Sequence, residues 1–360
     1  MAVASMSFRQ TDFVRSRGEP EIVACLIRAA AETGVRADPI SIINFYVAIK
    51  STQLVILAGP VHSGKIALIQ SLARVLTGGD SLRCQMMIGH AQWAGQTSNV
   101  ALFAEAQTRL NTDKILALIE EAWQSESMNR VFMACLTRIS QAELTGFFSE
   151  VAFQLRHGQI MRLPSAHLTE PIPYPPNLLL IGTMDDIRPN GLDVDLLSGA
   201  SVISWPAVEA GSAANRSQTV ALSDGESIFL RSCIRNEAAA RLKLDYILGR
   251  RTQAIRPLLQ LAEVFQQHAV PVSGAVMGKA IIYLANAWSN EGVGLFDRVS
   301  SHNFVIATDL AIAQTLVPSA REAIRHSTAL HSQLKVAFNG RFPRSAALLE
   351  IPREQRTEAG

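Results

Sequence analysis

The sequence lacks the features that would place it in a membrane, in a secretory pathway or on a highly charged partner. Its 360 residues contain no apolar stretch long enough to span a bilayer, and the first residues have no apolar core of signal-peptide length. The net charge is only +2, so bulk charge indicates neither nucleic acid nor an acidic membrane surface. We therefore expect a soluble, cytoplasmic protein with no membrane partner and no direct indication of nucleic-acid binding.

Cysteine is also scarce, and its spacing is not that of a metal centre. The four cysteines, Cys25, Cys84, Cys135 and Cys233, are scattered along the chain, and three of them lie in apolar runs. Reduced, packed thiols of an intracellular protein have this distribution. The sequence therefore predicts neither a disulfide framework nor a metal site.

Apolar sequence is what the chain has in quantity. Hydrophobic residues make up 48% of it, which favours a buried sheet over disorder. Short apolar runs alternate with helical patterns in the first part of the chain, as in an α/β fold with a mostly parallel sheet covered by helices on both faces. The later patterns are helical throughout, so we expect a second, small helical domain.

Changes in composition divide the chain into five segments. We predict a flexible arm at 1–18, an α/β domain at 19–206, a linker rich in Ala, Gly and Ser at 207–225, a helical lid domain at 226–350 and a tail at 351–360. Two short extended pieces between residues 159 and 172 are predicted to form a hairpin within the α/β domain.

The stretch from Leu54 to Leu76 carries the clearest functional signal. A short apolar run, a glycine-rich turn and a pattern of helical spacing follow one another, which is the context of a phosphate-binding loop. In such a loop, backbone N–H groups and a helix N-terminus converge on an anion, and Lys65 would reach the terminal phosphates. The predicted nucleotide-binding residues are Gly59, Pro60, Val61, His62, Ser63, Gly64, Lys65 and Ile66.

One position departs from the motif G-x-x-x-x-G-K-[ST]. The residue after the lysine should carry a hydroxyl that ligates Mg²⁺, and here it is Ile66. The loop can therefore still hold phosphate but has lost a metal ligand. The alternative is a glycine turn that joins a strand to a helix without any ligand, in which Lys65 would be an exposed surface lysine.

Four stretches of the chain, together with the order of its predicted elements, match one known family: IINFYVAIKSTQLVILAGPVHSGK, PIPYPPNLLLIGTMD, DLAIAQTLVP and FPRSAALL. Over about residues 38–350 the chain resembles an AAA+ ATPase, and more narrowly the McrB-like branch related to the restriction GTPase McrB. It implies an AAA+ core with a helical lid and binding of ATP or GTP. It also implies homo- or hetero-oligomers with AAA+ subunits, a protein partner, and a remodelling or genome-defence context.

The resemblance assigns catalytic positions whose usual residues are missing here. It places Thr137 and Arg138 where the family has an acidic pair, and Asp185 where a sensor strand usually ends in asparagine. Leu197 to Ala200 stand near the place where the family often supplies an arginine finger. No Asp or Glu occurs from Val131 through Gln141. No residue is therefore assigned a catalytic role.

These losses argue against ordinary ATPase turnover and against a firmly bound Mg²⁺. An arginine finger alone is worth roughly a thousand-fold in turnover. Without a metal, Thr137 and Arg138 leave about one positive charge beside Lys65, which suits a nucleotide or other phosphate held without Mg²⁺. The resemblance also makes Arg344, at the start of the last helix, a candidate lid contact with the nucleotide.

The predicted function is a nucleotide-binding subunit of an oligomeric assembly that hydrolyses slowly or not at all. Two alternatives stay open. One is an active ATP or GTP hydrolase whose missing groups come from neighbouring subunits or from the pair Asp185 and Asp186, since paired carboxylates bind Mg²⁺. The other is a nucleotide-free scaffold that acts through protein contacts alone.

Overall fold

The structure is a computed structural model that describes residues 18–89, 100–157, 173–185, 194–206, 224–249 and 251–350. Four predicted segments lie wholly or largely outside the described residues. They are the arm at 1–18, the hairpin between 159 and 172, the linker at 207–225 and the tail at 351–360.

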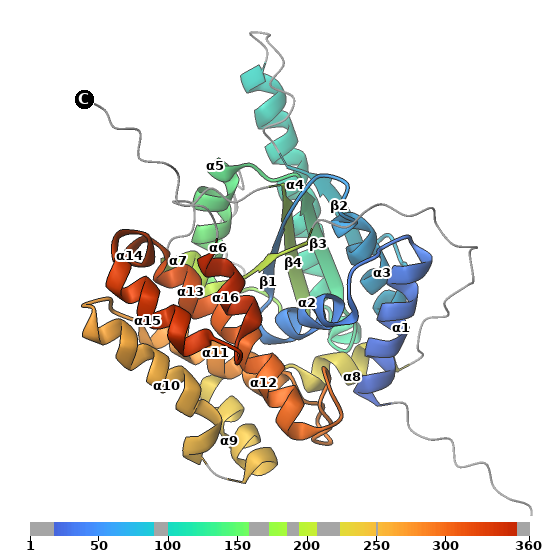
Figure 1. The fold of residues 1–360 in the computed structure, drawn as a ribbon. Coiled ribbons are helices and arrows are strands. Elements are labelled where there is room, and N and C mark those ends of the chain that lie inside the picture. The colour runs from blue at the N-terminus through green and yellow to red at the C-terminus, as the bar shows by residue number, and fades with distance from the viewer. Residues whose placement is uncertain are drawn as a thin grey trace, which may run out of the picture.

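The described strands form one parallel sheet, as the alternation of apolar runs and helices predicts (Figure 1). The strands are β1 (Leu54–Ala58), β2 (Cys84–Ile88), β3 (Phe132–Thr137), β4 (Leu178–Met184) and β5 (Ser201–Ser204). Their spatial order is β2-β3-β4-β1-β5, so β1 lies between β4 and β5. Because the strands run in one direction, the loop after β1 shares an edge of the sheet with the ends of β3 and β4.

Both faces of the sheet are buried, which explains why its strands are apolar runs and not alternating patterns. Successive residues of β1 point to opposite faces: Val55 and Leu57 belong to one hydrophobic cluster, and Leu54 and Ile56 to the other. The first face is covered by α1 (Glu19–Glu32), α2 (Pro39–Ser51), α3 (Lys65–Thr77) and α8 (Gly225–Ser232). The second is covered by α4 (Val100–Ala122), the π-helical turn η3 (Leu144–Phe148), α6 (Ser149–Arg156) and α7 (Val194–Gly199), and the short helix α5 (Gln141–Glu143) leads into η3.

Local sequence signals set the ends of the first helices. Asp38 caps α2 by accepting a hydrogen bond from the Ser41 backbone N–H at 2.9 Å, and Pro39 occupies the first helical position. Gly34, just after α1, has φ +83°, a value that favours glycine. The helix predicted from Gln141 to Arg156 is interrupted by the π-helical turn η3 (Leu144–Phe148), which sequence periodicity does not reveal. A short 3₁₀ turn, η2 (Ser125–Ser127), follows α4.

The second part of the chain is helical and lies beside the sheet (Figure 1, orange to red). Its elements are α9 (Glu237–Leu248), α10 (Arg251–Gln267), α11 (Gly274–Asn286), α12 (Ser300–Ala311), the π-helical turn η4 (Ile312–Leu316), α13 (Val317–Ser319), α14 (Arg321–His326), α15 (Thr328–Phe338) and α16 (Pro343–Leu349). The buried side chains of α11 and of η4 belong to the same hydrophobic cluster as those of α1, α2 and α3. The helical part is therefore packed onto the α/β part through a shared core.

Helix α8 belongs with the α/β part, although the sequence places residue 226 in the lid. Its Glu226 carboxylate pairs with the Arg83 guanidinium at 2.6 Å and accepts the Val131 backbone N–H at 2.6 Å. Phe229 packs edge-on against Tyr46 of α2, with ring centroids 5.7 Å apart. The helical part thus begins at α9, and residue 225, predicted to end the linker, is the first residue of α8.

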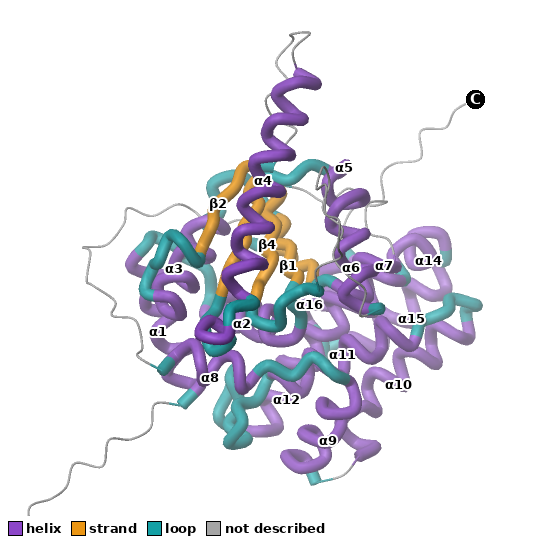
Figure 2. Tube along the Cα trace, turned by 180° about the vertical axis from the view of Figure 1, so that it is seen from behind, coloured by secondary structure: helices purple, strands orange, loops and turns teal. Residues whose placement is uncertain are grey.

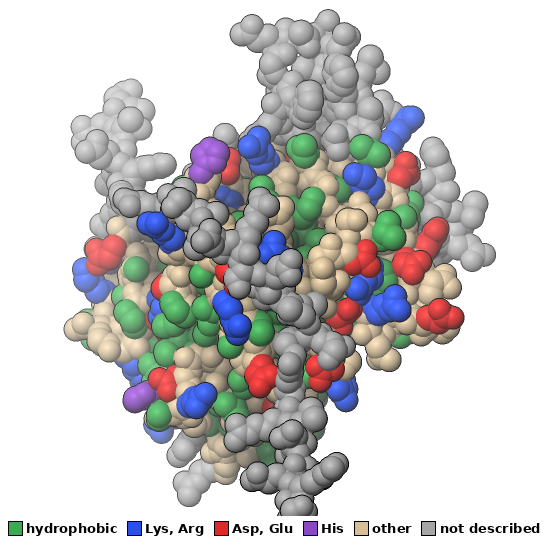
Figure 3. Space-filling view, turned by 90° about the vertical axis from the view of Figure 1, so that its right-hand side faces the viewer, with side chains coloured by type: hydrophobic (Ala, Val, Ile, Leu, Met, Phe, Trp, Pro, Cys, Tyr) green, Lys and Arg blue, Asp and Glu red, His purple; other side chains and the backbone are tan. Residues whose placement is uncertain are grey.

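The surface carries charged side chains of both signs. On the face shown in Figure 3, described basic and acidic side chains are interspersed. Within the described ranges, no helix combines the length and the apolar character needed to cross a membrane. Helix α4 projects beyond the sheet, as the view from behind shows (Figure 2).

Candidate functional site

The loop between β1 and α3 has the backbone of an anion cradle. Gly64 is the N-cap of α3 and has φ +85°, and His62 has φ +61°, so two left-handed residues turn the chain into the helix. The first hydrogen bond of α3 is donated by the Leu68 N–H to the Gly64 oxygen at 2.9 Å. Among the described residues, the N–H groups of Lys65 and Ile66 find no backbone acceptor, as is usual at the start of a helix.

Lys65 lies folded inside this loop and is only 6% exposed. Its Nζ donates to the Gly59 oxygen at 2.5 Å and to the Pro60 oxygen at 2.7 Å, and lies 3.3 Å from the Ser63 Oγ. Lys65 is therefore not the exposed surface lysine that a glycine turn without a ligand would have. The carbonyl oxygens of the loop accept hydrogen bonds from the ammonium group, as phosphate oxygens would.

Asp185 is the predicted site residue that the fold brings to Lys65. It follows β4, the neighbour of β1, and its Oδ1 lies 3.7 Å from the Lys65 Nζ. Burial lowers the pKa of Lys65, and the Asp185 carboxylate opposes that shift. The Asp185 side chain is 39% exposed, so this ion pair is screened and adds little stability.

Trp205 holds the loop in place, and sequence reasoning missed it. Its indole N–H donates to the Ser63 oxygen at 2.8 Å, and the side chain is buried. Its backbone lies against Gly59, where a Cβ atom would overlap the Trp205 carbonyl oxygen. A buried indole N–H needs an acceptor, but only the pairing of β5 with β1 shows that the acceptor is this loop.

The end of β3 presents different chemistry. Thr137 is the last residue of the strand and is buried, and its Oγ1 donates to the Met87 oxygen of β2 at 3.1 Å. Its side chain therefore engages β2 and not the loop. Arg138 is exposed and has φ +57°, a strained backbone for a residue with a side chain. Its N–H donates to the Thr183 Oγ1 at 3.1 Å.

The structure thus brings together only some of the predicted site residues. Lys65, Ser63 and Asp185 converge after β1 and β4. Arg138 follows β3, which lies two strands from β1, a separation of roughly 10 Å at the usual spacing of neighbouring strands. Val61 and Ile66 are exposed on the loop, at 52% and 38%, where they face solvent or a ligand.

Arg344 sits at the start of α16, and its backbone has a structural role. The Arg344 N–H donates to one carboxylate oxygen of the buried Asp309 at 2.9 Å, and the Ser345 N–H donates to the other at 2.9 Å. Asp309 therefore caps α16. The Arg344 side chain is half-buried. A nucleotide contact from Arg344 remains a prediction.

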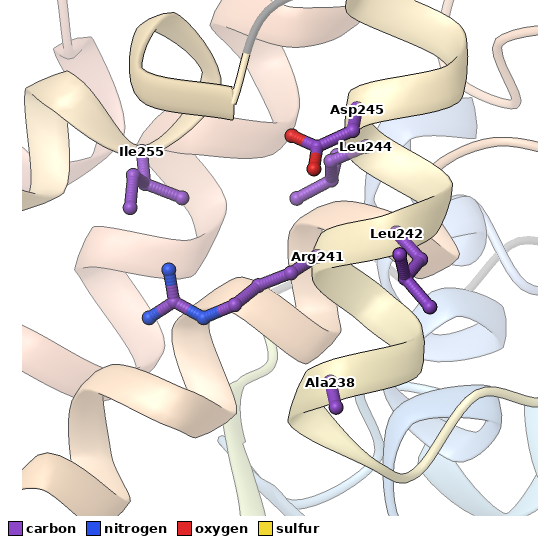
Figure 4. A pocket seen from close by; sticks show the side chains of 6 residues that line it. All are labelled: Ala238, Arg241, Leu242, Leu244, Asp245 and Ile255. Carbon is purple, nitrogen blue, oxygen red and sulfur yellow. The ribbon is translucent and has the colours of Figure 1, made fainter.

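Two further observations concern ligands. Within the described part of the chain, no group of three or more His, Cys, Asp or Glu side chains is arranged to hold a metal ion. A hollow of about 420 Å³ lies between α9 and α10, lined by Ala238, Arg241, Leu242, Leu244, Asp245 and Ile255 (Figure 4). Arg241 there is tied to the Glu237 carboxylate at 2.7 Å, and no predicted site residue lines this hollow.

Comparison with protein families and curated proteins gives no relative on which to base a function. No protein-family model matches the chain, and no curated protein matches it at a significant level. The functional argument therefore depends on the geometry of the loop and of the strand ends around it.

Proposed function

We propose that this chain is an AAA+-type subunit that binds ATP or GTP at the β1–α3 loop and hydrolyses it slowly or not at all. The observation that carries the proposal is the buried Lys65 beneath a left-handed loop, next to unengaged N–H groups at the start of α3. A lysine and free amides at a helix N-terminus are the groups that phosphate requires.

Phosphate binding would exchange partners within the loop. The Lys65 Nζ would leave the oxygens of Gly59 and Pro60, now 2.5 and 2.7 Å away, for phosphate oxygens. The N–H groups of Lys65 and Ile66 would donate to the same anion. Trp205 would keep the loop from opening, because its indole holds the Ser63 oxygen at 2.8 Å.

The strand ends support slow or absent hydrolysis. Where the resemblance requires two carboxylates, β3 ends in Thr137 and continues into Arg138. A hydroxyl that donates to a β2 carbonyl and an exposed guanidinium neither hold Mg²⁺ nor polarise an attacking water. Ile66 also leaves the first metal ligand of the loop missing.

The charge of the site differs from the sum based on Lys65 and Arg138 alone. Asp185 adds one carboxylate at 3.7 Å from the Lys65 Nζ, so the charge of Lys65 is offset locally, and Arg138, two strands away, is the cation that remains. A nucleotide without Mg²⁺ would still find Lys65 and the N–H groups of α3, but it would also meet the Asp185 carboxylate. We expect Asp185 to weaken binding of the metal-free nucleotide.

The same carboxylate favours a second candidate, an active hydrolase. Asp185 stands close enough to Lys65 to share a metal–phosphate complex, and Asp186, the other half of the pair, lies outside the described residues. Paired carboxylates are Mg²⁺ ligands. A neighbouring subunit would then have to supply the remaining groups. Assembly into an oligomer, a protein partner and a remodelling or defence context rest on the sequence resemblance alone.

Titration calorimetry with ATP and GTP, each with and without Mg²⁺, tests the proposal. We expect saturable binding of at least one nucleotide that changes less than about tenfold when Mg²⁺ is removed, together with negligible phosphate release. Binding that requires Mg²⁺, with turnover abolished by Lys65→Ala, would establish the hydrolase. Absence of binding under every condition, with the fold intact by circular dichroism, would leave the nucleotide-free scaffold.

A further inference from the structure

A second cavity, of about 250 Å³, lies at the opposite edge of the sheet from the phosphate loop. It is lined by the ends of α2, α6 and α7 from the α/β part and by the starts of α9 and α11 from the helical part. Thr52 and Gln53 lead from it into β1, and Gly199 lies just before β5. The cavity therefore joins the two parts of the molecule.

The charged side chains that line this cavity are mostly cationic. Three of them, Arg156, Arg235 and Lys279, face a single carboxylate, Glu237. Glu237 is already engaged, because its Oε1 accepts a hydrogen bond from the Arg241 Nε at 2.8 Å. Arg156 is partly neutralised by Asp195, whose Oδ1 lies 3.5 Å from its Nη1. The remaining two cations have no carboxylate of their own within the described residues.

Lys279 is the first of these uncompensated cations. It is only 6% exposed, and its Nζ makes one hydrogen bond, to the Leu197 oxygen at 2.9 Å. Burial lowers its pKa to about 7. A buried ammonium group is normally paired with a charge, and this one has two N–H donors left over.

Arg235 is the second. Its Nη1 donates to the Pro176 oxygen at 2.5 Å, while its Nε and one Nη remain buried without a hydrogen-bond partner. An unpaired buried guanidinium N–H is costly, and native structures rarely keep one without a ligand or water. The N-terminus of α11 also lies at the cavity, and its dipole adds a further positive contribution.

We propose that this cavity binds a small oxyanion, either free phosphate or the phosphate group of a small phosphomonoester, between Arg235, Lys279 and Arg156. Guanidinium and ammonium groups are the residues that recognise phosphate oxygens. The volume equals about eight water molecules at about 30 Å³ each, enough for a phosphate group with a small body and less than a pocket for a whole nucleotide. The ligand would tie the helical part to the start of β1.

The test must separate this cavity from the phosphate loop, which is itself an anion site. The full chain carrying Lys65→Ala is titrated with sulfate, inorganic phosphate and glycerol phosphate, and calorimetry measures the binding. We expect one anion bound per chain and retained in this variant. Tighter binding of glycerol phosphate than of inorganic phosphate would indicate a phosphomonoester as the natural ligand, and the reverse would indicate free phosphate.

Substitutions at the cavity then locate the bound anion. Adding Arg235→Gln should weaken sulfate binding roughly 10- to 100-fold, the worth of a hydrogen bond to a charged group. Arg156→Gln, on a more exposed side chain, serves in the same way if the first variant does not fold. The matched control is Arg28→Gln on the exposed face of α1, which should leave binding unchanged.

A pH series gives a second readout that a purely structural role would not move. Sulfate keeps its charge between pH 6 and 9, whereas Lys279 loses its proton as pH rises through about 7. The other charged groups around the cavity are Arg156, Arg235, Asp195 and Glu237. Affinity for sulfate should therefore be full below pH 7 and fall about tenfold per pH unit well above it.

Three outcomes would overturn the proposal. One is no saturable sulfate or phosphate binding in the folded Lys65→Ala protein. Another is binding that Arg235→Gln and Arg156→Gln leave unchanged. The third is a change of oligomeric state, and not of anion affinity, in these variants, which would mean that the cavity receives an acidic side chain of another copy. None of these depends on nucleotide binding at the loop, so the two proposals fail separately.

Discussion

The ends of β1 and β3 lie on the same edge of one sheet, but the residues that follow them have different chemistry. After β1, the chain makes a left-handed loop at Gly64 that encloses a buried lysine and leaves helix N–H groups unengaged. After β3, it presents Thr137, bonded to a neighbouring strand, and the exposed Arg138. Under the proposed function, the groups that would bind phosphate are present after β1, whereas no Asp or Glu occurs from Val131 through Gln141.

The comparison shows why binding and catalysis can separate in such a fold. The cradle consists of backbone N–H groups and one lysine, and its shape is set by glycines and by Trp205 packed on Gly59. Catalysis needs carboxylates at the end of another strand, where the surrounding structure tolerates other side chains. Under the proposed function, the absence of acids after β3 would therefore leave the loop geometry intact.

The largest effect is expected from a substitution in the loop after β1. Gly59→Ala should destabilise the protein by about 3 kcal/mol, because the added Cβ would overlap the Trp205 carbonyl oxygen and force the two backbones apart. Thermal and urea unfolding measure the loss. The control is Gly274→Ala at the start of α11, where the added methyl group meets no atom and unfolding should be nearly unchanged. Equal effects at the two positions would refute the close packing of loop and strand.

Removing Lys65 tests the loop after β1 through nucleotide binding. Lys65→Ala should weaken ATP or GTP binding by about 2 kcal/mol, roughly thirtyfold, because one charge-assisted contact to phosphate is lost. Calorimetry measures the affinity. Lys335→Ala removes an exposed lysine on α15 and should have no effect. If both variants bind as the unmodified chain does, the nucleotide does not sit in the β1–α3 loop.

Introducing the groups that the resemblance expects tests the catalytic positions assigned after β3. Ile66→Thr, Thr137→Asp and Arg138→Glu together should raise nucleotide affinity roughly tenfold in the presence of Mg²⁺ and lower it in its absence, since two carboxylates now require the metal. The same triple change with Lys65→Ala is the control. A restored protein with no gain in the presence of Mg²⁺ would show that these residues do not occupy the catalytic positions assigned to them.

The smallest effect concerns the backbone of Arg138. Its φ of +57° is unfavourable for a residue with a side chain, so Arg138→Gly should stabilise the protein by about 1 kcal/mol. Arg28→Gly, at an exposed position within α1, is the matched control and should destabilise by a similar amount. Urea unfolding distinguishes the two signs. A loss of stability at position 138 would show that the guanidinium makes a contact worth more than the strain.

Sequence alone predicted most of the local structure. The apolar run of β1, the glycine turn and the helical spacing after Lys65 lie within a few residues of one another, and the structure has a strand, a loop and a helix there. The cap at Asp38 with Pro39 likewise marked the start of α2. Boundaries were less well predicted where an element depends on distant packing, as for the π-helical turn η3 and for α8.

The sequence by itself determined the parallel α/β architecture, the loop with its lysine, and the absence of acids between Val131 and Gln141. Only the tertiary structure decided that Asp185 pairs with Lys65, that Trp205 secures the loop, and that Arg235 and Lys279 share a cavity at the far edge. The reason is physical. Periodicity and capping act over a few neighbouring residues, whereas strand order and helix packing are set by burial of surfaces far apart in the chain.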